Sequence, residues 1–160
     1  MYVDFNELPE NSRIWIYQSN RSFTETEQTK LHLKIKTYLE NWTAHGIGLT
    51  ASYEIRYNRF IVIGVNQDLH AVSGCSLDNL AQFIQQLEKD FQVDLLDRMN
   101  VSYRQGDFIA YKNLADFKKM VKEKAVSAKT IVFNNLVNTK VEYETDWEIP
   151  MEESWHSRFL

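Results

Sequence analysis

Phe60-Ile61-Val62-Ile63-Gly64-Val65 is the stretch that decides the fold, because it is apolar without interruption. A strand that is apolar on both faces is typical of the centre of a sheet, where each face is covered. Upstream of it, apolar and polar residues alternate from Leu49 to Tyr57, which is typical of a strand with one face in water. Asn58 between the two segments marks a turn, so the sequence predicts a β-hairpin.

A helix is predicted on each side of this hairpin. Upstream, Thr24 and Glu27 fit a capping box, and we expect Gly46 to end the helix as a left-handed cap. Downstream, a second helix is expected to begin at Ser76. Apolar residues recur at the spacing of one helix face in both segments. They are Leu31, Ile35, Tyr38, Leu39 and Trp42 in the first, and Leu80, Phe83, Ile84, Leu87 and Phe91 in the second.

Further strands are predicted at both ends of this region. Arg13–Tyr17 is rich in β-forming residues, and Val101–Tyr103 and Phe108–Tyr111 carry similar apolar signals. The order strand, helix, strand, strand, helix, strand matches the β-α-β-β-α-β plan of ferredoxin-like domains. The sequence therefore predicts an α+β fold with a ferredoxin-like core.

The remaining residues predict a C-terminal helix and strand extension of that core. Asn113 is expected to cap a third helix, Thr130–Phe133 to form a strand, and Val141–Tyr143 to pair with it. The aromatic tail 146–160 is expected to dock on its own domain. Because the two prolines lie near the ends of the chain, we expect one domain over residues 1–160, with a compact core of about residues 12–148.

Composition excludes several classes of protein. The chain is 44% hydrophobic, so it can bury a core, and its net charge of −4 argues against binding nucleic acid by bulk charge. The single cysteine, Cys75, makes no intrachain disulfide and no cysteine-rich zinc site. No apolar run is long enough to span a membrane, and the acidic, polar first residues are unlike a secretory signal. These features predict a cytoplasmic protein.

Charge is unevenly distributed near the C-terminus. The segment from Lys112 to Thr130 contains six lysines and two carboxylates. The segment from Val141 to Glu153 contains six carboxylates and no lysine or arginine. Two solvated surfaces that attract each other are the simplest interpretation. The lysine segment has no arginine, which argues against a nucleic-acid patch.

The best candidate site is the predicted strand-to-helix loop that runs from His70 to Asp78. Gly74 lets a ligand approach the backbone, and free amides of Cys75, Ser76 and Leu77 at a helix start favour an anion. The candidate ligand-binding residues of this loop are Ser73, Gly74, Cys75 and Ser76. The helix dipole also lowers the pKa of a thiol, so Cys75 is a candidate nucleophile with His70 as its base.

Two further interpretations belong to this candidate site. Arg158 of the tail could reach the loop and complete an anion site from a distance. The structural alternative is that Cys75 packs in the core and Ser76 only caps a helix.

No motif for a cofactor or a metal is found. A phosphate-binding P-loop needs Gly-Lys followed by Ser or Thr, and the chain has no Gly-Lys pair. The four histidines are not spaced as metal ligands with one another or with Cys75. We therefore expect neither metal nor cofactor, and no recognised catalytic motif marks the chain as an enzyme.

Three segments together resemble a small, uncharacterised bacterial family of about this length. They are Ser73-Gly74-Cys75-Ser76, residues 130–137 (Thr-Ile-Val-Phe-Asn-Asn-Leu-Val) and Ser154-Trp155-His156-Ser157-Arg158. Members of that family often carry the label "ABC transporter ATPase", although the residues here include no phosphate loop. The resemblance implies a standalone bacterial domain and transfers no catalytic residue.

Two functions are open on the sequence. The first is a binding or interaction module, whose partner could be another protein or a second copy of the chain. The second is a small anionic-ligand-binding protein or thiol enzyme, with its site at Ser73–Ser76.

Overall fold

The computed structural model describes residues 1–160, and the chain divides into two compact units. The N-terminal unit comprises Met1–Leu96 and Asn138–Val141, and the C-terminal unit comprises Asp97–Val137 and Glu142–Leu160. Helices and antiparallel strands occur in both, which confirms the α+β class. The single domain over residues 1–160 stays a prediction. None of the helices combines the length and the apolarity that crossing a membrane requires.

The N-terminal unit is built on a three-stranded antiparallel sheet in the order β1-β5-β4. Its strands are β1 (Arg13–Gln18), β4 (Ala51–Arg56) and β5 (Phe60–Val65). All residues of β5 are buried, as its unbroken apolar sequence predicts. The predicted hairpin is confirmed, because β4 pairs with β5 in antiparallel register.

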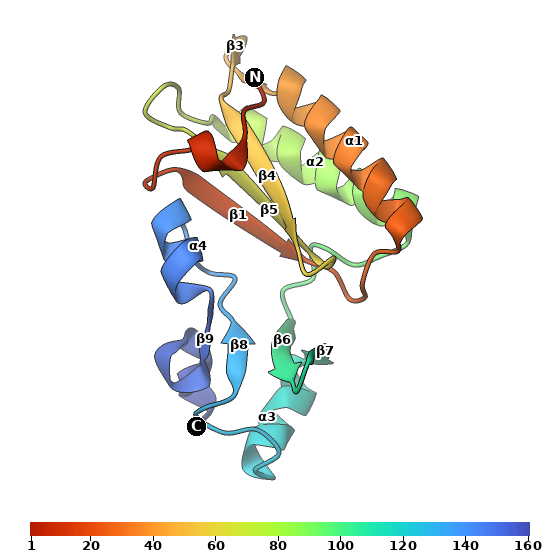
Figure 1. Ribbon diagram of the computed structural model, residues 1–160, viewed down its shortest axis with the longest axis vertical. Coiled ribbons are helices and arrows are strands. Elements are labelled where there is room, and N and C mark those ends of the chain that lie inside the picture. The colour runs from red at the N-terminus through yellow and green to blue at the C-terminus, as the bar shows by residue number, and fades with distance from the viewer. The chain divides into compact units, whose positions relative to one another are not determined.

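Two helices, α1 (Glu25–Asn41) and α2 (Gly74–Phe91), lie side by side on one face of this sheet (Figure 1). The capping box at Thr24 is confirmed, with the Thr24 hydroxyl accepting from the Glu27 amide. The helix α2 begins at Gly74 rather than at Ser76, because Ser73 is its N-cap. The shared core buries Leu31, Ile35, Leu39, Ile61, Ile63, Leu80, Ile84 and Leu87.

The prediction that Gly46 caps the first helix is wrong. That helix ends at Asn41, and Trp42 already has extended backbone angles. The next residues form a short hairpin of β2 (Thr43–Ala44) and β3 (Ile47–Gly48). His45 and Gly46 have φ of 52° and 76°, so the left-handed conformation makes a tight hairpin turn here.

Gly64 in the central strand is required by close packing on the second face of the sheet. A Cβ atom there would lie 2.6 Å from Leu8 Cδ1 and 3.1 Å from Ile14 Cδ1. The chain before Leu8 forms the 3-10 helix η1 (Phe5–Glu7), and Phe5 also lies close to this position. The glycine therefore lets the N-terminal segment pack directly on the backbone of β5.

A segment from late in the chain, Asn138–Val141, completes the N-terminal unit. The Ile14 amide donates to the Asn138 carbonyl at 2.8 Å, and the Lys140 amide donates to the Ser12 carbonyl at 2.9 Å. Lys140 is buried, and its Nζ donates to the Leu8 carbonyl at 2.7 Å. This segment therefore extends the edge of β1 where that strand begins.

The C-terminal unit contains a second sheet, in the order β7-β6-β8-β9. Its strands are β6 (Asn100–Gln105), β7 (Phe108–Asn113), β8 (Ile131–Phe133) and β9 (Glu148–Pro150). The helix α3 (Leu114–Lys122) follows, and Asn113 caps it as predicted.

Two predicted strands have different places from those expected. Val101–Tyr103, expected as the fourth strand of the core, lies in the C-terminal unit's sheet, so the ferredoxin-like topology is not confirmed. Val141–Tyr143 is not a strand, because it lies within the helix α4 (Lys140–Asp146). The partner of β8 is β9.

The aromatic tail docks on the C-terminal unit, within which it forms β9 and the 3-10 helices η2 (Met151–Glu153) and η3 (Trp155–Phe159). Met151 is fully buried beside Phe117 of α3, and the Phe159 ring meets the Phe117 ring edge-on at 6.3 Å. His156 is also buried and lies edge-on to Phe117. The tail is therefore part of this unit's core.

Candidate functional site

An open groove of about 570 Å³ lies in the N-terminal unit, where the end of α1, the β2–β3 hairpin and the start of α2 meet. A volume of this order suits a small molecule. Three of the predicted loop residues line it, namely Ser73, Cys75 and Ser76. The other lining residues are Thr37, Tyr38, Asn41, Trp42, Thr43, His45 and Asn79.

The side chains of the two serines of the loop form the N-terminal capping box of α2. Ser73 Oγ accepts from the Ser76 amide at 3.1 Å, while Ser76 Oγ accepts from the Ser73 amide at 2.7 Å and donates to the Ser73 carbonyl at 2.8 Å. The Leu77 amide also donates to the Ser73 carbonyl. Of the amides that the sequence assigned to an anion, those of Ser76 and Leu77 are thus already satisfied within the loop.

Gly74 and Cys75 form the open part of the loop. Both are exposed, and no atom would lie within 4 Å of a Cβ added at Gly74. Cys75 is a free, exposed thiol that lines the groove, so it is not a core residue. The interpretation that Cys75 packs in the core is therefore wrong. The interpretation that Ser76 caps a helix agrees with the structure, in which Ser76 is buried and belongs to the capping box of α2.

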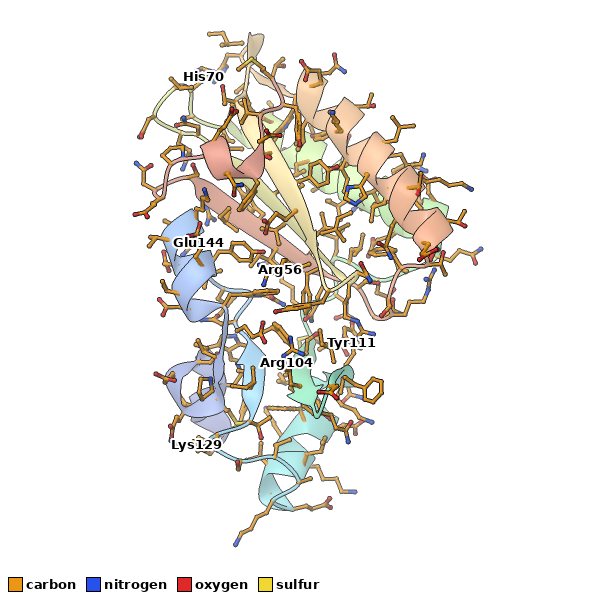
Figure 2. The ribbon with its side chains drawn as sticks, in the orientation of Figure 1. Arg56, His70, Arg104, Tyr111, Lys129 and Glu144 are labelled. Atoms are coloured by element: carbon orange, nitrogen blue, oxygen red, sulfur yellow. The ribbon has the colours of Figure 1, made fainter.

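His70 lies in the loop between β5 and α2 and is directed toward the β2–β3 hairpin (Figure 2). Its Nε2 donates to the Ala44 carbonyl at 2.9 Å, which ties the loop to the hairpin. No hydrogen bond joins His70 to Cys75. The nucleophile and base pair of Cys75 and His70 therefore stays a prediction.

Arg158 belongs to the C-terminal unit, whereas the groove is lined by residues of the N-terminal unit. Its guanidinium carbon lies 5.8 Å from the centroid of the Trp155 ring. The contribution of Arg158 to an anion site stays a prediction.

Four groove residues from α1 and its C-cap were not identified as site residues from the sequence: Thr37, Tyr38, Asn41 and Trp42. Helical spacing assigned Tyr38 and Trp42 to the core, and Trp42 is indeed buried, with its Nε1 donating to the Ser76 carbonyl at 3.0 Å. Tyr38 is half-buried and stacks on Phe83, with ring centroids 4.0 Å apart. The sequence held no signal that the end of α1 would meet the start of α2.

The groove is polar, and its titratable lining residues are Tyr38, His45 and Cys75, since no Asp, Glu, Lys or Arg lines it. The Tyr38 hydroxyl donates to Asn79 Oδ1 at 2.6 Å, and burial raises the pKa of the Tyr38 phenol, with the charge of Tyr17 adding to the effect. Tyr38 is thus a neutral hydrogen-bonding group at every ordinary pH. No group of three or more His, Cys, Asp or Glu side chains could hold a metal ion.

Comparison with known proteins gives no relative from which a role can be transferred. No family model, no curated protein and no solved structure matches the chain. The resemblance to the bacterial family stays a prediction.

Proposed function

We propose that this protein is a binding module that recognises a small, uncharged polar molecule in the groove between α1, the β2–β3 hairpin and α2. The observation that carries the proposal is the lining of that groove. It offers hydroxyls, amides, aromatic rings, the His45 imidazole and the Cys75 thiol, but no carboxylate, ammonium or guanidinium group. A charged ligand would find no Asp, Glu, Lys or Arg side chain there with which to form an ion pair.

The walls of the groove are held in place by hydrogen bonds that tie its three elements together. Trp42 Nε1 joins the end of α1 to the start of α2, and His70 Nε2 joins the β5–α2 loop to the hairpin. Tyr38 and Asn79 add a further link between the two helices. A site that is rigid before its ligand arrives loses little entropy on binding.

Binding is favoured over catalysis because the groove shows no assembled reactive group. Cys75 is exposed, but His70 is engaged with a backbone carbonyl. Binding of a small anion is disfavoured, because the amides of Ser76 and Leu77, which an anion would need, already donate to Ser73.

Three further proposals, on fold relationship, location and family, accompany this function. We propose a ferredoxin-like relationship for the N-terminal unit, supported by the order β1-α1-β4-β5-α2 and by the place of β5 between β1 and β4. We propose a cytoplasmic location, supported by the free, exposed thiol of Cys75, which suits a reducing compartment. Membership of the bacterial family is supported only by the three segments that resemble it.

The experiment is a two-dimensional amide NMR screen of the full chain against neutral polar and anionic small molecules. We expect neutral compounds to shift the signals of residues that line the groove. The variant Cys75→Trp fills the groove from an exposed position and should remove these shifts. Gln85→Trp introduces the same residue at an exposed position of α2 outside the groove and should leave these shifts intact. Shifts that only anions cause, or shifts that survive in Cys75→Trp, would overturn the proposal.

A further inference from the structure

We propose that a basic surface of the C-terminal unit docks on a bilayer of anionic lipids. This basic surface comprises Phe108 and the lysines Lys112, Lys118, Lys119, Lys122 and Lys124, all of them exposed. None of these residues lines the groove, so the inference does not depend on the proposed binding of a small molecule.

The register of β6 and β7 places Phe108 and Lys112 on the face of the sheet that α3 covers. Side chains alternate between the two faces along a strand, so Phe108, Ala110 and Lys112 share one face of β7. Ala110 lies opposite Tyr103 and packs in the same core cluster as Phe117 of α3. Phe108 and Lys112 therefore flank the position at which α3 packs on β7, beside which the helix lies in Figure 1.

The helix α3 buries one side and presents lysines on the other. Phe117 is fully buried, and Met120 is partly buried in the same cluster. The exposed lysines are Lys118, Lys119 and Lys122 within the helix, and Lys112 and Lys124 just outside its two ends. The solvent side of α3 is therefore mainly basic.

Few of these lysines are neutralised by a carboxylate. Lys119 lies 3.9 Å from Glu123, and Asp116 accepts a hydrogen bond from Asn113 in the cap of α3. With Asp107 at the hairpin turn, these are three carboxylates against five lysines, so the surface keeps a positive charge. No ion pair engages Lys112, Lys118, Lys122 or Lys124.

The stability of the helix does not account for this concentration of charge. The helix dipole favours Lys119 and Lys122 in the last turn, and Lys118 Nζ lies 5.3 Å from the Phe159 ring centroid. However, Lys118 and Lys122 are four residues apart, and like charges at that spacing repel each other. Lys112 precedes the N-terminus of α3, where the same dipole disfavours a cation. A negatively charged surface would relieve both effects.

Phe108 supplies an apolar contact beside these charges. Its side chain is 78% exposed, more than any other large hydrophobic residue of the chain. It directly follows the two-residue turn at Gly106 and Asp107, so it stands at the tip of the β6–β7 hairpin. A ring in this position can enter the boundary between headgroups and acyl chains while the lysines contact the headgroups.

The residue types of the basic surface favour lipid over nucleic acid or protein. They include no arginine, whose planar fork suits individual phosphates, and a single exposed aromatic ring is too few to stack successive bases. Protein interfaces are depleted in lysine and enriched in arginine and aromatic residues. A bilayer of anionic lipids attracts lysines through charge alone and requires no fixed geometry.

The test is co-sedimentation of the full chain with phosphatidylcholine vesicles that do or do not contain phosphatidylserine. We expect binding to the vesicles with phosphatidylserine and none to phosphatidylcholine alone. Binding should be lost when the salt concentration rises from about 0.05 M to about 0.5 M, because salt screens exposed charges.

Two double variants with the same change of net charge separate the basic surface from bulk charge. Lys118→Gln with Lys122→Gln should weaken binding by about tenfold or more, since each lysine near an anionic surface contributes about fivefold. Lys30→Gln with Lys89→Gln changes exposed positions of α1 and α2 and should alter binding by less than about twofold.

A third variant, Phe108→Ala, keeps every lysine and tests the apolar contact. It should weaken vesicle binding by about tenfold, because no aromatic ring then leaves water. Circular dichroism confirms that each variant is folded.

Several outcomes would overturn the inference. They are the absence of binding to phosphatidylserine vesicles at low salt, and equal losses in the two double variants. Tighter binding of a single-stranded oligothymidylate than of the vesicles would assign the surface to nucleic acid instead. Unchanged binding by Phe108→Ala would show that the ring stays outside the bilayer, and the choice of lipid over other polyanions would fall with it.

Discussion

His156 shows most clearly how a single residue depends on its surroundings. The ring is buried, stacks on Trp155 at 3.9 Å and meets Phe117 edge-on, while Ser154 Oγ lies 2.7 Å from its Nδ1. Burial lowers the pKa of His156 to about 4, because an imidazolium there would lose its hydration. The neutral imidazole is therefore the form that the C-terminal unit holds.

This gives a prediction for stability against pH. Between the ordinary histidine pKa of about 6.5 and the folded value of about 4, the unfolded chain binds a proton that the folded chain does not. The contribution of neutral His156 is therefore complete above pH 6.5 and falls, by up to about 3 kcal/mol, as the pH drops toward 4. Urea unfolding followed by circular dichroism from pH 7 to pH 4 measures it.

The matched variants for that measurement are His156→Gln and His45→Gln. His156→Gln should be less stable at pH 7 and show a flatter dependence on pH. His45 is exposed at the hairpin turn, so His45→Gln should keep the wild-type slope. Equal slopes for wild type and His156→Gln would show that another group controls acid stability.

At the same scale, the sequence identified part of the candidate site. Ser73, Cys75 and Ser76 do line a groove, because a strand-to-helix loop is exposed in almost any packing. Asn41 and Asn79 were missed because nothing local distinguishes a groove asparagine from any exposed one. Their proximity depends on how α1 and α2 pack, which is a tertiary property.

Among the elements, α1 begins in the way its sequence predicts. Thr24 and Glu27 form both halves of the capping box. Glu27 also pairs with Arg21 at 2.8 Å, and the Arg21 Nη2 donates to the carbonyl of Phe91 at the end of α2. The hydrogen bond from Arg21, followed by that from the Thr24 amide, lowers the pKa of Glu27 to about 2. The start of one helix is thus fastened to the end of the other.

We expect Thr24→Ala to lower the free energy of unfolding by about 1 kcal/mol, since the Glu27 amide loses its acceptor. Thr26→Ala changes an exposed threonine in the same turn and should have an effect below about 0.5 kcal/mol. Chemical denaturation of both variants measures the difference. Equal losses would mean that the cap contributes nothing beyond helix propensity.

The sequence predicted elements correctly where the local residue pattern determines the structure. It was wrong where a short segment fits two kinds of element. The central position of β5 followed from residues that are apolar on both faces. Val141–Tyr143 was wrongly expected as a strand, since three residues hold too little periodicity to separate a strand from a helix turn. Gly46 was misassigned because a left-handed glycine serves a hairpin turn as well as a helix cap.

For the whole molecule, the sequence predicted the α+β class but not the division into two compact units. The proline-free middle of the chain gave no sign of a boundary after Leu96, because the boundary depends on which sheet each strand joins. β6 joins β7 and β8 rather than β1, and no local pattern determines that choice.

The largest sequence separation among the described hydrogen bonds gives a prediction at this scale. Lys140 Nζ binds the Leu8 carbonyl, 132 residues earlier, and lies 5.3 Å from the Phe5 ring centroid. We expect Lys140→Met to lower the free energy of unfolding by about 1–3 kcal/mol, because the buried Leu8 carbonyl loses its donor. Hydrogen exchange should quicken at the amides of Ile14, Lys140 and Val141.

Lys30→Met is the control, because Lys30 is exposed on α1. It should leave stability and exchange at these three amides unchanged. Wild-type exchange at Ile14 in the Lys140→Met variant would show that the segment is held by its backbone alone.

The return of Asn138–Val141 to the N-terminal unit also sets an order of events on the ribosome. Translation is vectorial, and domains usually fold as their own residues emerge. Here the beginning of β1 must wait for its neighbour until all of Asp97–Val137 has been synthesised. A nascent chain released early, at Leu96, would thus carry both helices and all three strands of the first sheet but would leave the amide of Ile14 and the carbonyls of Leu8 and Ser12 without the partners they have in the finished protein.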